Sequence, residues 1–125
     1  MGIYYHSEVL HGDKQGRKIS FPTINLNTKI WPKNKQAGVY SCTVTINDSI
    51  YDGALYFGPR TINNEEKNVL EIFLLNFSHE IYGTEVFFQL HTFIRPVLHL
   101  SSLQELKSQI EKDVVAVKKS LLIEI

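Results

Sequence analysis

Residues 12–26 place basic side chains, glycines and small oxygen-bearing side chains next to one another. Thr23 and Asn25 follow Pro22 in a stretch that should be extended, where alternate side chains share one face. Mg²⁺ prefers oxygen ligands and is usually held by one or two protein oxygens together with substrate phosphates. A hydroxyl and an amide oxygen on one face fit that need. The alternative is that both are ordinary turn residues, and the short motif alone does not decide between the two.

The preceding loop could bind the phosphates themselves. Backbone N–H groups between Gly12 and Gly16 could cradle phosphate oxygens, with Arg17 and Lys18 close by. The spacing matches neither a P-loop nor a dinucleotide-binding fingerprint, and such a loop is more often a hairpin turn with solvated charges. Residues 1–38 carry six Lys or Arg and two Asp or Glu, a balance of +4, which would favour an anionic ligand.

Glu71 is the second unusual residue. In an extended segment it shares a face with four apolar side chains, those of Val69, Phe73, Leu75 and Phe77. A carboxylate on an apolar face is costly unless it is paired, solvated or functional. Partial desolvation would make it a better general base. The simpler interpretation is a strand-end glutamate that reaches water at the mouth of a barrel.

The other chemically capable residues give weaker signals. Arg95 follows the last predicted strand and could bind an anionic or planar polar ligand. The five histidines show no spacing typical of metal ligands. Cys42 alternates with core residues, which predicts a buried rather than a reactive thiol.

Composition excludes several classes of protein. The chain has 125 residues, 43% of them hydrophobic and 21% charged, which is typical of one globular domain. A single cysteine allows no intrachain disulfide and fits a reducing compartment. No apolar run has the length of a secretory signal or a membrane span, so we expect a soluble, cytoplasmic protein. A net charge of zero gives no support to nucleic-acid binding.

Short alternating segments separated by turns must position these residues. Six strands are predicted, at 3–11, 19–26, 38–46, 50–57, 69–77 and 85–94. From Ser102 onward apolar residues recur at helical spacing, at 103, 106, 110, 114, 117 and 121, and Ser102 with Glu105 forms a capping-box pattern. Lys118 and Lys119 fall in the expected last turns. The pattern predicts a small antiparallel barrel with a covering helix, without fixing its connectivity.

Taken together, the motifs resemble those of the riboflavin kinase family over nearly the whole chain. They are Gly-x-x-x-Gly-Arg at 12–17, Phe-Pro-Thr-Ile-Asn at 21–25, Gly-Val-Tyr at 38–40, Val-Leu-Glu at 69–71 with Leu-Leu-Asn-Phe at 74–77, Tyr-Gly at 82–83, Ile-Arg-Pro at 94–96 and the segment 102–113. The resemblance implies a mainly β fold, a six-stranded antiparallel Greek-key-like barrel with a C-terminal helix. It also implies transfer of the ATP γ-phosphate to riboflavin, which gives FMN.

The resemblance carries roles for individual residues. Thr23 and Asn25 would bind Mg²⁺ and the ATP phosphates, and Glu71 would be the catalytic base. The nucleotide-binding set would add Gly12, Gly16, Arg17, Lys18, Leu74, Asn76 and Tyr82. Arg95 and Leu100 would lie on the flavin side. We expect riboflavin, FMN, ATP and ADP as partners of a monomer, with no nucleic-acid or membrane partner. Residues 1–125 would form one kinase domain without an adenylyltransferase domain, so FAD synthesis is not expected.

Several positions depart from the pattern of the family. Ser20 replaces a usual Gly, Ile24 a usual Ala, Tyr56 an expected Asn, Val97 a common Glu and Leu100 a common Phe, and the loop at 58–61 lacks the proline before its Thr. Because the changes gather on the flavin side, a non-catalytic flavin- or nucleotide-binding module is one alternative. A barrel that binds single-stranded nucleic acid is another, against which the zero net charge and the lack of a basic–aromatic stripe argue.

Overall fold

A computed structural model describes residues 3–10, 23–60, 67–77 and 81–123 of the chain. The six strands are β1 (Tyr4–Glu8), β2 (Thr23–Leu26), β3 (Gly38–Ile46), β4 (Ser49–Pro59), β5 (Asn68–Leu74) and β6 (Glu85–Pro96). A short 3₁₀ helix, η1 (Thr28–Ile30), follows β2, and the helix α2 (Leu103–Ile123) follows β6. The predicted order of six strands and one helix is therefore confirmed.

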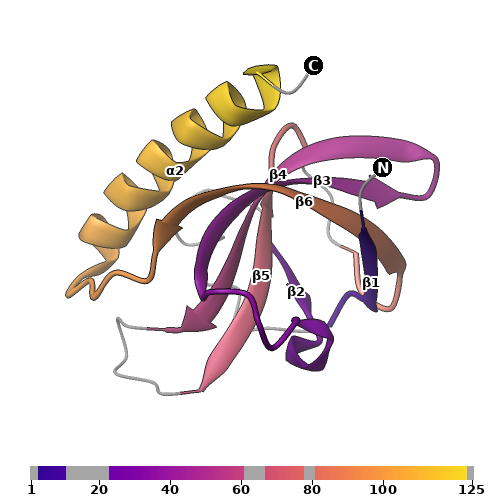
Figure 1. Ribbon diagram of the computed structural model, residues 1–125, viewed down its shortest axis with the longest axis horizontal. Helices are drawn as coiled ribbons and strands as arrows, with labels where there is room; N and C mark the ends of the chain where they lie inside the picture. Colours follow the sequence, from indigo (N-terminus) through magenta and orange to yellow (C-terminus); the bar gives the residue numbers. More distant parts are fainter. Residues whose placement is uncertain (1–2, 11–22, 61–66, 78–80, 124–125) are drawn as a thin grey trace.

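The strands form one curled antiparallel sheet in the order β1-β6-β3-β4-β5-β2 (Figure 1). Within it β3, β4 and β5 are successive neighbours and β6 returns to lie beside β3, which is a Greek-key arrangement. The curl brings the two edges of the sheet together. The segment that follows β1 meets β2 there, where the Leu10 N–H donates to the carbonyl of Asn25 at 2.7 Å. Among the described residues this one bridge joins the two edges, and the sheet forms a curled half-barrel.

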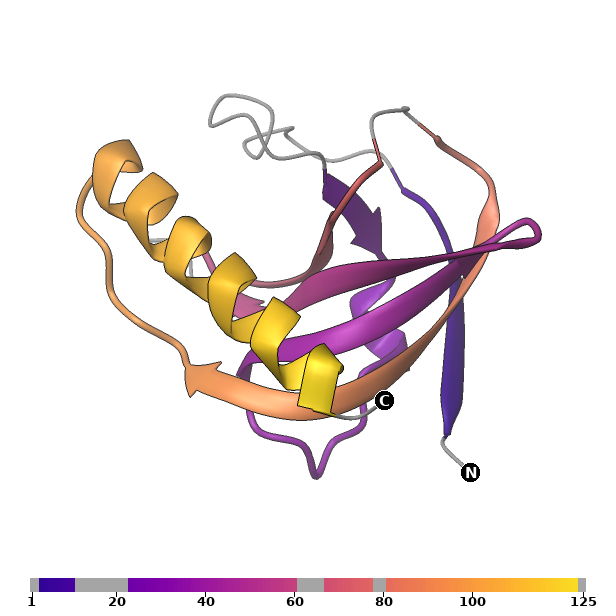
Figure 2. The ribbon, with the colours of Figure 1, turned by 90° about the horizontal axis from the view of Figure 1, so that it is seen from above.

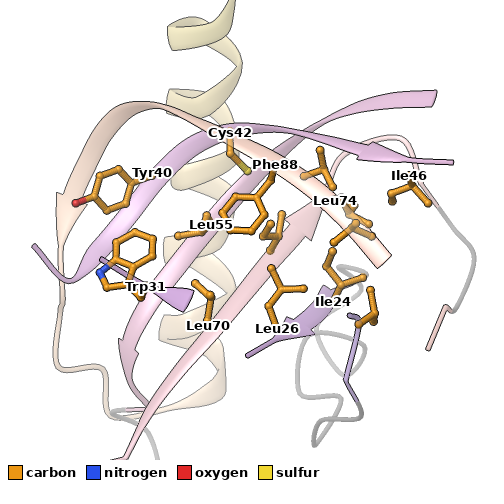
Figure 3. Close-up of a cluster of buried hydrophobic side chains, with 14 residues drawn as sticks. Ile24, Leu26, Trp31, Tyr40, Cys42, Ile46, Leu55, Leu70, Leu74 and Phe88 are labelled. Carbon is orange, nitrogen blue, oxygen red and sulfur yellow. The ribbon is translucent and has the colours of Figure 1, made fainter. Parts of the chain in front are cut away.

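The hydrophobic core lies inside the curl of the sheet. Tyr40, Cys42, Val44 and Ile46 line it from alternate positions of β3, as predicted. Figure 3 shows these side chains grouped with those of β2, β4, β5 and β6, among them Leu26, Leu55, Leu70 and Phe88. Cys42 is fully buried, and this burial raises the pKa of its thiol, as expected for a structural cysteine.

Helix α2 packs on the outer face of the sheet, against β3, β4 and β6 (Figure 2). Its buried side chains include Ile110 and Val117 from the predicted apolar stripe, whereas Leu103 at the start of that stripe is exposed. The Glu105 N–H donates to Ser102 Oγ at 3.1 Å, which confirms Ser102 as the capping residue. The Glu105 carboxylate accepts instead from the N–H of Ser101, one residue before the position that a capping box uses.

Several observed element boundaries differ from the expected ones, among them the end of β1 at Glu8. β4 continues through Pro59 and β6 through Pro96, each ending at a proline, which has no N–H for a further ladder bond. β5 ends at Leu74, because Asn76 adopts a left-handed conformation with φ 60° and turns the chain. α2 runs to Ile123, so Lys118 and Lys119 lie before its last turn rather than in it.

Candidate active site on the outer face of the sheet

A row of residues crosses the outer face of the sheet at one level. The strand registers pair Asn25 with Glu71, Glu71 with Tyr56, Tyr56 with Val39 and Val39 with Arg95. Residues directly opposite one another on neighbouring strands point to the same face. The candidate metal ligand Asn25 and the candidate base Glu71 are therefore on adjacent strands, and the candidate flavin-side arginine lies in the same row, three strands from Glu71.

Thr23 and Asn25 occupy the positions expected of them on β2. Both are half-buried, whereas Ile24 and Leu26 between and beyond them are 4% exposed and lie in the core. Thr23 lies opposite Phe73, two residues along β5 from Glu71. The hydroxyl, the amide oxygen and the carboxylate therefore share one face, and all are oxygen donors of the kind that Mg²⁺ accepts. In the described ranges no three His, Cys, Asp or Glu side chains group to hold a metal.

Glu71 is buried in the middle of β5 and is only 7% exposed. Its Oε2 accepts from Nη2 of Arg60 at 3.2 Å, and the side chain of Arg60 is 12% exposed. The interpretation of Glu71 as a strand-end residue open to water is therefore wrong. β4 extends beyond the level of Glu71 to Pro59, and this extension brings Arg60 to the carboxylate.

Tyr56 lies directly opposite Glu71 on β4. Its hydroxyl donates a hydrogen bond to the carbonyl of Pro59. Burial raises the pKa of Tyr56 to about 12, with Arg95 and Arg60 acting to lower it and the Glu71 carboxylate to raise it. The phenol thus lies among the charged groups of the site. The sequence marked Tyr56 only as a departure from the family pattern, since nothing in its type or spacing showed where its hydroxyl points.

Arg95 is held by Asp113 of α2 in a bidentate ion pair. Its Nε and Nη2 donate to the two carboxylate oxygens at 2.8 and 2.7 Å, and its Nη1 donates to the carbonyl of Pro96 at 2.9 Å. A guanidinium has five N–H groups, so these three bonds leave at most two for a ligand. The main contact of this predicted flavin residue is thus with the helix. No role was predicted for Asp113, although its position three residues after Ile110 and four before Val117 places it on the apolar face of the helix.

The remaining predicted residues lie at varied depths. Leu74 is 2% exposed and its side chain belongs to the core, so only its backbone can face a ligand. Asn76 is exposed and Tyr82 packs partly against the core. Leu100 lies in the segment that connects β6 to α2 and is partly buried. Gly12, Gly16, Arg17 and Lys18 lie outside the described residues, as do the departures at Ser20 and Thr61.

Comparison with protein families gives a match over almost the whole chain. The profile of the flavokinase family, described as riboflavin kinase, matches residues 2–121. A bifunctional riboflavin kinase/FMN adenylyltransferase of Haemophilus influenzae is 38% identical over 111 residues, which cover 88% of this chain and 36% of that protein. The RNA-binding riboflavin kinase RibR of Bacillus subtilis is 35% identical over 112 residues, which cover 89% of this chain and 48% of that protein.

Solved structures share the fold. A crystal structure described as a macrolide-efflux protein from Streptococcus pneumoniae matches with a TM-score of 0.77 and 25% identity, over 94% of this chain and 38% of that one. The riboflavin kinase of Trypanosoma brucei matches with a TM-score of 0.65 and 23% identity, over 95% of this chain and 79% of that one, and at this identity it supports the fold alone.

The curated relatives are longer than this chain. The chain spans 48% of the length of the Bacillus subtilis relative and 34% of that of a bifunctional riboflavin kinase/FMN adenylyltransferase of Listeria monocytogenes. Among the described helices, none is long and apolar enough to cross a membrane. The match of the family profile over residues 2–121 nevertheless covers every strand and nearly all of α2. The chain therefore belongs to the flavokinase, or riboflavin kinase, family.

Proposed function

We propose that this chain transfers the γ-phosphoryl group of ATP to the 5′-hydroxyl of riboflavin and so forms FMN and ADP. The observation that supports it most directly is the pairing of Asn25 with Glu71 across β2 and β5, with Thr23 on the same face. Oxygen donors for a phosphate-bound cation and a carboxylate for proton transfer are thereby adjacent. A kinase needs little more, because phosphoryl transfer depends mainly on positioning and charge stabilisation.

Thr23 and Asn25 would hold Mg²⁺ together with the phosphates of ATP. With a cation held there, these residues would gain neutralisation of the charge that develops on the phosphates during transfer. The half-buried positions of both side chains suit a cation that keeps part of its water shell. Asn76, Tyr82, the backbone of Leu74 and the basic residues 17 and 18 would complete the nucleotide site.

Glu71 would act as the general base. It would accept the proton of the terminal ribityl hydroxyl while that oxygen bonds to the γ-phosphorus and the bond to the β,γ-bridging oxygen breaks, releasing ADP. Arg95 and Leu100 would lie on the side of the flavin, Arg95 through the N–H groups that Asp113 and Pro96 do not use. The departures at Tyr56 and Val97 fall on this side and leave Thr23, Asn25 and Glu71 intact, which favours a kinase over a non-catalytic binding module.

The remaining partner and location assignments stay predictions. A cytoplasmic location and the absence of a nucleic-acid partner were expected from composition and charge, and a monomeric state was expected together with the family resemblance. RNA binding is a named property of the Bacillus subtilis relative, of which this chain covers 48%. The proposal for this chain therefore concerns the kinase reaction and not RNA binding or FAD synthesis.

One assay tests the proposal directly. The purified chain is incubated with riboflavin, ATP and Mg²⁺, and the flavins are separated by chromatography. FMN that forms in proportion to enzyme, and that disappears when EDTA removes the cation, is the expected result. Tight flavin binding without any FMN would support the non-catalytic module instead. A gel-shift experiment with labelled RNA at low and high salt, run in parallel, tests the third alternative.

A further inference from the structure

The proposed reaction assigns no role to the contact between Arg60 and Glu71. Nη2 of Arg60 lies 3.2 Å from Oε2 of Glu71, and the two side chains are only 12% and 9% exposed. An ion pair so far removed from water is a strong local constraint, because separating the partners would leave a buried charge uncompensated. Arg60 therefore fixes both the charge and the direction of the Glu71 carboxylate.

Arg60 itself is held in place from the neighbouring backbone. It directly follows Pro59, the last residue of β4, whose carbonyl accepts the hydroxyl of Tyr56. Tyr56 lies opposite Glu71 in the ladder between β4 and β5. Tyr56 is thus hydrogen-bonded to Pro59, Pro59 is bonded in the chain to Arg60, and Arg60 forms the ion pair with Glu71. The register pairing of Glu71 with Tyr56 completes the circuit.

We propose that Arg60 is a positioning residue that orients Glu71 for proton transfer, and that Tyr56 supports Arg60 by holding the Pro59 carbonyl. The inference rests on the proposed kinase function. It assigns to Arg60 an action through Glu71 on the hydroxyl of the acceptor, and not a contact with the ATP phosphates. It also gives a purpose to Tyr56, the residue that stands where the family usually has Asn.

Charged and polar side chains of the neighbouring strands lie near Glu71. On β4, Arg60 is the cation in contact with the carboxylate, and Tyr56 is neutral below its raised pKa of about 12. The register partner on β2 is the uncharged Asn25. Arg95 of β6 lies beyond Tyr56 in the same row and is paired with Asp113 of α2. Loss of Arg60 would therefore remove a positive charge that lies 3.2 Å from the Glu71 carboxylate.

A double-mutant cycle tests the inference. The single variants are Arg60→Gln and Glu71→Gln, the double variant carries both, and Lys67→Gln is the control that removes an exposed cation near the start of β5. We expect Arg60→Gln to lower kcat about 10–100-fold, in the range caused by a misplaced catalytic group, and the control to have wild-type activity. In the Glu71→Gln background, Arg60→Gln should lower kcat by no more than about 2-fold, because residues that act as one unit are not additive.

Two further measurements separate positioning from phosphate binding. A positioning role acts on turnover and not on substrate capture, so Arg60→Gln should lower kcat and leave the KM for riboflavin within about 3-fold of the wild-type value. The Kd for MgATP, from calorimetry, should change by less than about 3-fold. A loss of MgATP affinity of about 10-fold or more, with an unchanged kcat, would place Arg60 on the phosphates and overturn the inference.

Conservative variants keep the test decisive if Arg60→Gln folds poorly by circular dichroism. Arg60→Lys keeps the charge, and its kcat should lie between those of the wild type and Arg60→Gln. Tyr56→Phe should lower kcat in the wild-type background and not in Glu71→Gln. Equal losses in both backgrounds would overturn the support assigned to Tyr56. A wild-type chain that makes no FMN would instead refute the proposed function, so the two failures are distinguishable.

Discussion

The guanidinium of Arg95 on β6 and the carboxylate of Asp113 on α2 form two parallel hydrogen bonds, at 2.8 and 2.7 Å. Their side chains are 15% and 6% exposed, so the pair is largely shielded from water. Gln109 of the same helix also donates to Asp113, at 3.0 Å. This pair anchors α2 to the sheet at the level of the row that contains Glu71 and Tyr56. The helix is thus attached at the proposed site as well as through its apolar face.

Asp113→Ala should destabilise the fold strongly, because it leaves the buried guanidinium of Arg95 without its partner. We expect a loss of about 3 kcal/mol, seen as a fall in melting temperature of roughly 10 °C. Glu111→Ala, an exposed carboxylate of the same helix, is the matched control and should change the melting temperature little. Equal melting temperatures for the two variants would show that the pair contributes little to stability.

Glu71→Gln should fold normally and lose most of its kinase activity. The amide keeps the size of the side chain and accepts a hydrogen bond from Arg60, but it cannot take up the substrate proton. General-base help is worth about 10²–10⁴-fold, so the rate of FMN formation should fall within that range. Glu111→Gln serves as the control for loss of a carboxylate. Near-wild-type turnover of Glu71→Gln would remove this residue from the mechanism.

Asn25→Ala should raise the Mg²⁺ concentration that gives half-maximal activity. The variant removes one of the two side-chain oxygens proposed to hold the cation, and loss of even an outer partner of a metal typically costs about 10-fold or more. The measurement is FMN formation across a Mg²⁺ titration at fixed riboflavin and ATP. Asn34→Ala, in the exposed loop before β3, is the control. An unchanged Mg²⁺ dependence would separate Asn25 from the metal.

Gly38→Ala should be far more harmful than Gly83→Ala. Gly38 has φ +147°, and a Cβ there would lie 2.2 Å from the carbonyl oxygen of Arg95. Overpacking and backbone strain together predict a loss of about 3 kcal/mol. Gly83 has φ +74° with nothing within 4 Å of an added Cβ, so only the conformational cost of about 1 kcal/mol is expected. Denaturant unfolding of the two variants checks this order, and similar stabilities would contradict it.

Tyr56 should make the fold sensitive to alkali. An unfolded tyrosine loses its proton near pH 10, whereas burial first of all raises the pKa of folded Tyr56 to about 12. Between these values the unfolded state binds fewer protons, so the free energy of unfolding falls as the pH rises from about 10 to about 12. Urea unfolding across this window should show a shallower fall for Tyr56→Phe.

A residual fall should remain in Tyr56→Phe. Burial also raises the pKa of Tyr40 and that of the Cys42 thiol, and both groups stay protonated longer in the folded state. An identical slope for the wild type and Tyr56→Phe would show that the phenol of Tyr56 is not shielded from water. The slope is the useful quantity, because the lost hydrogen bond to Pro59 lowers the stability of the variant at every pH.

The fold was predictable where a local rule applied. Alternation at Tyr40, Cys42 and Val44 predicted the inner face of β3, and the spacing of Ile110 and Val117 predicted the inner face of α2. Strand ends were less predictable. A loop was expected from residue 58, but β4 continues to Pro59 because β5 pairs with it as far as Asn68. Pairing between distant segments decided that boundary, and no local signal encodes it.

The candidate site was predictable only in part, for the same reason. Motif and alternation singled out Thr23, Asn25 and Glu71 as candidates, and the strand register places Asn25 opposite Glu71. Arg60 and Asp113 were not found, since each gains its importance from a partner on another element. Arg95 was expected to face a ligand, and most of its described contacts are to Asp113 and Pro96 instead.

By itself, the sequence determined the identities that chemistry requires and the faces on which they lie, because side-chain type and the two-residue period of a strand are local properties. Its motifs also pointed to the riboflavin kinase family. The tertiary structure alone decided which of these groups meet. The strand ladders pair β2 with β5 and extend β4 past Glu71, so that the carboxylate of Glu71 is buried against Arg60. Such contacts depend on strand register and on closure, which are properties of the whole chain.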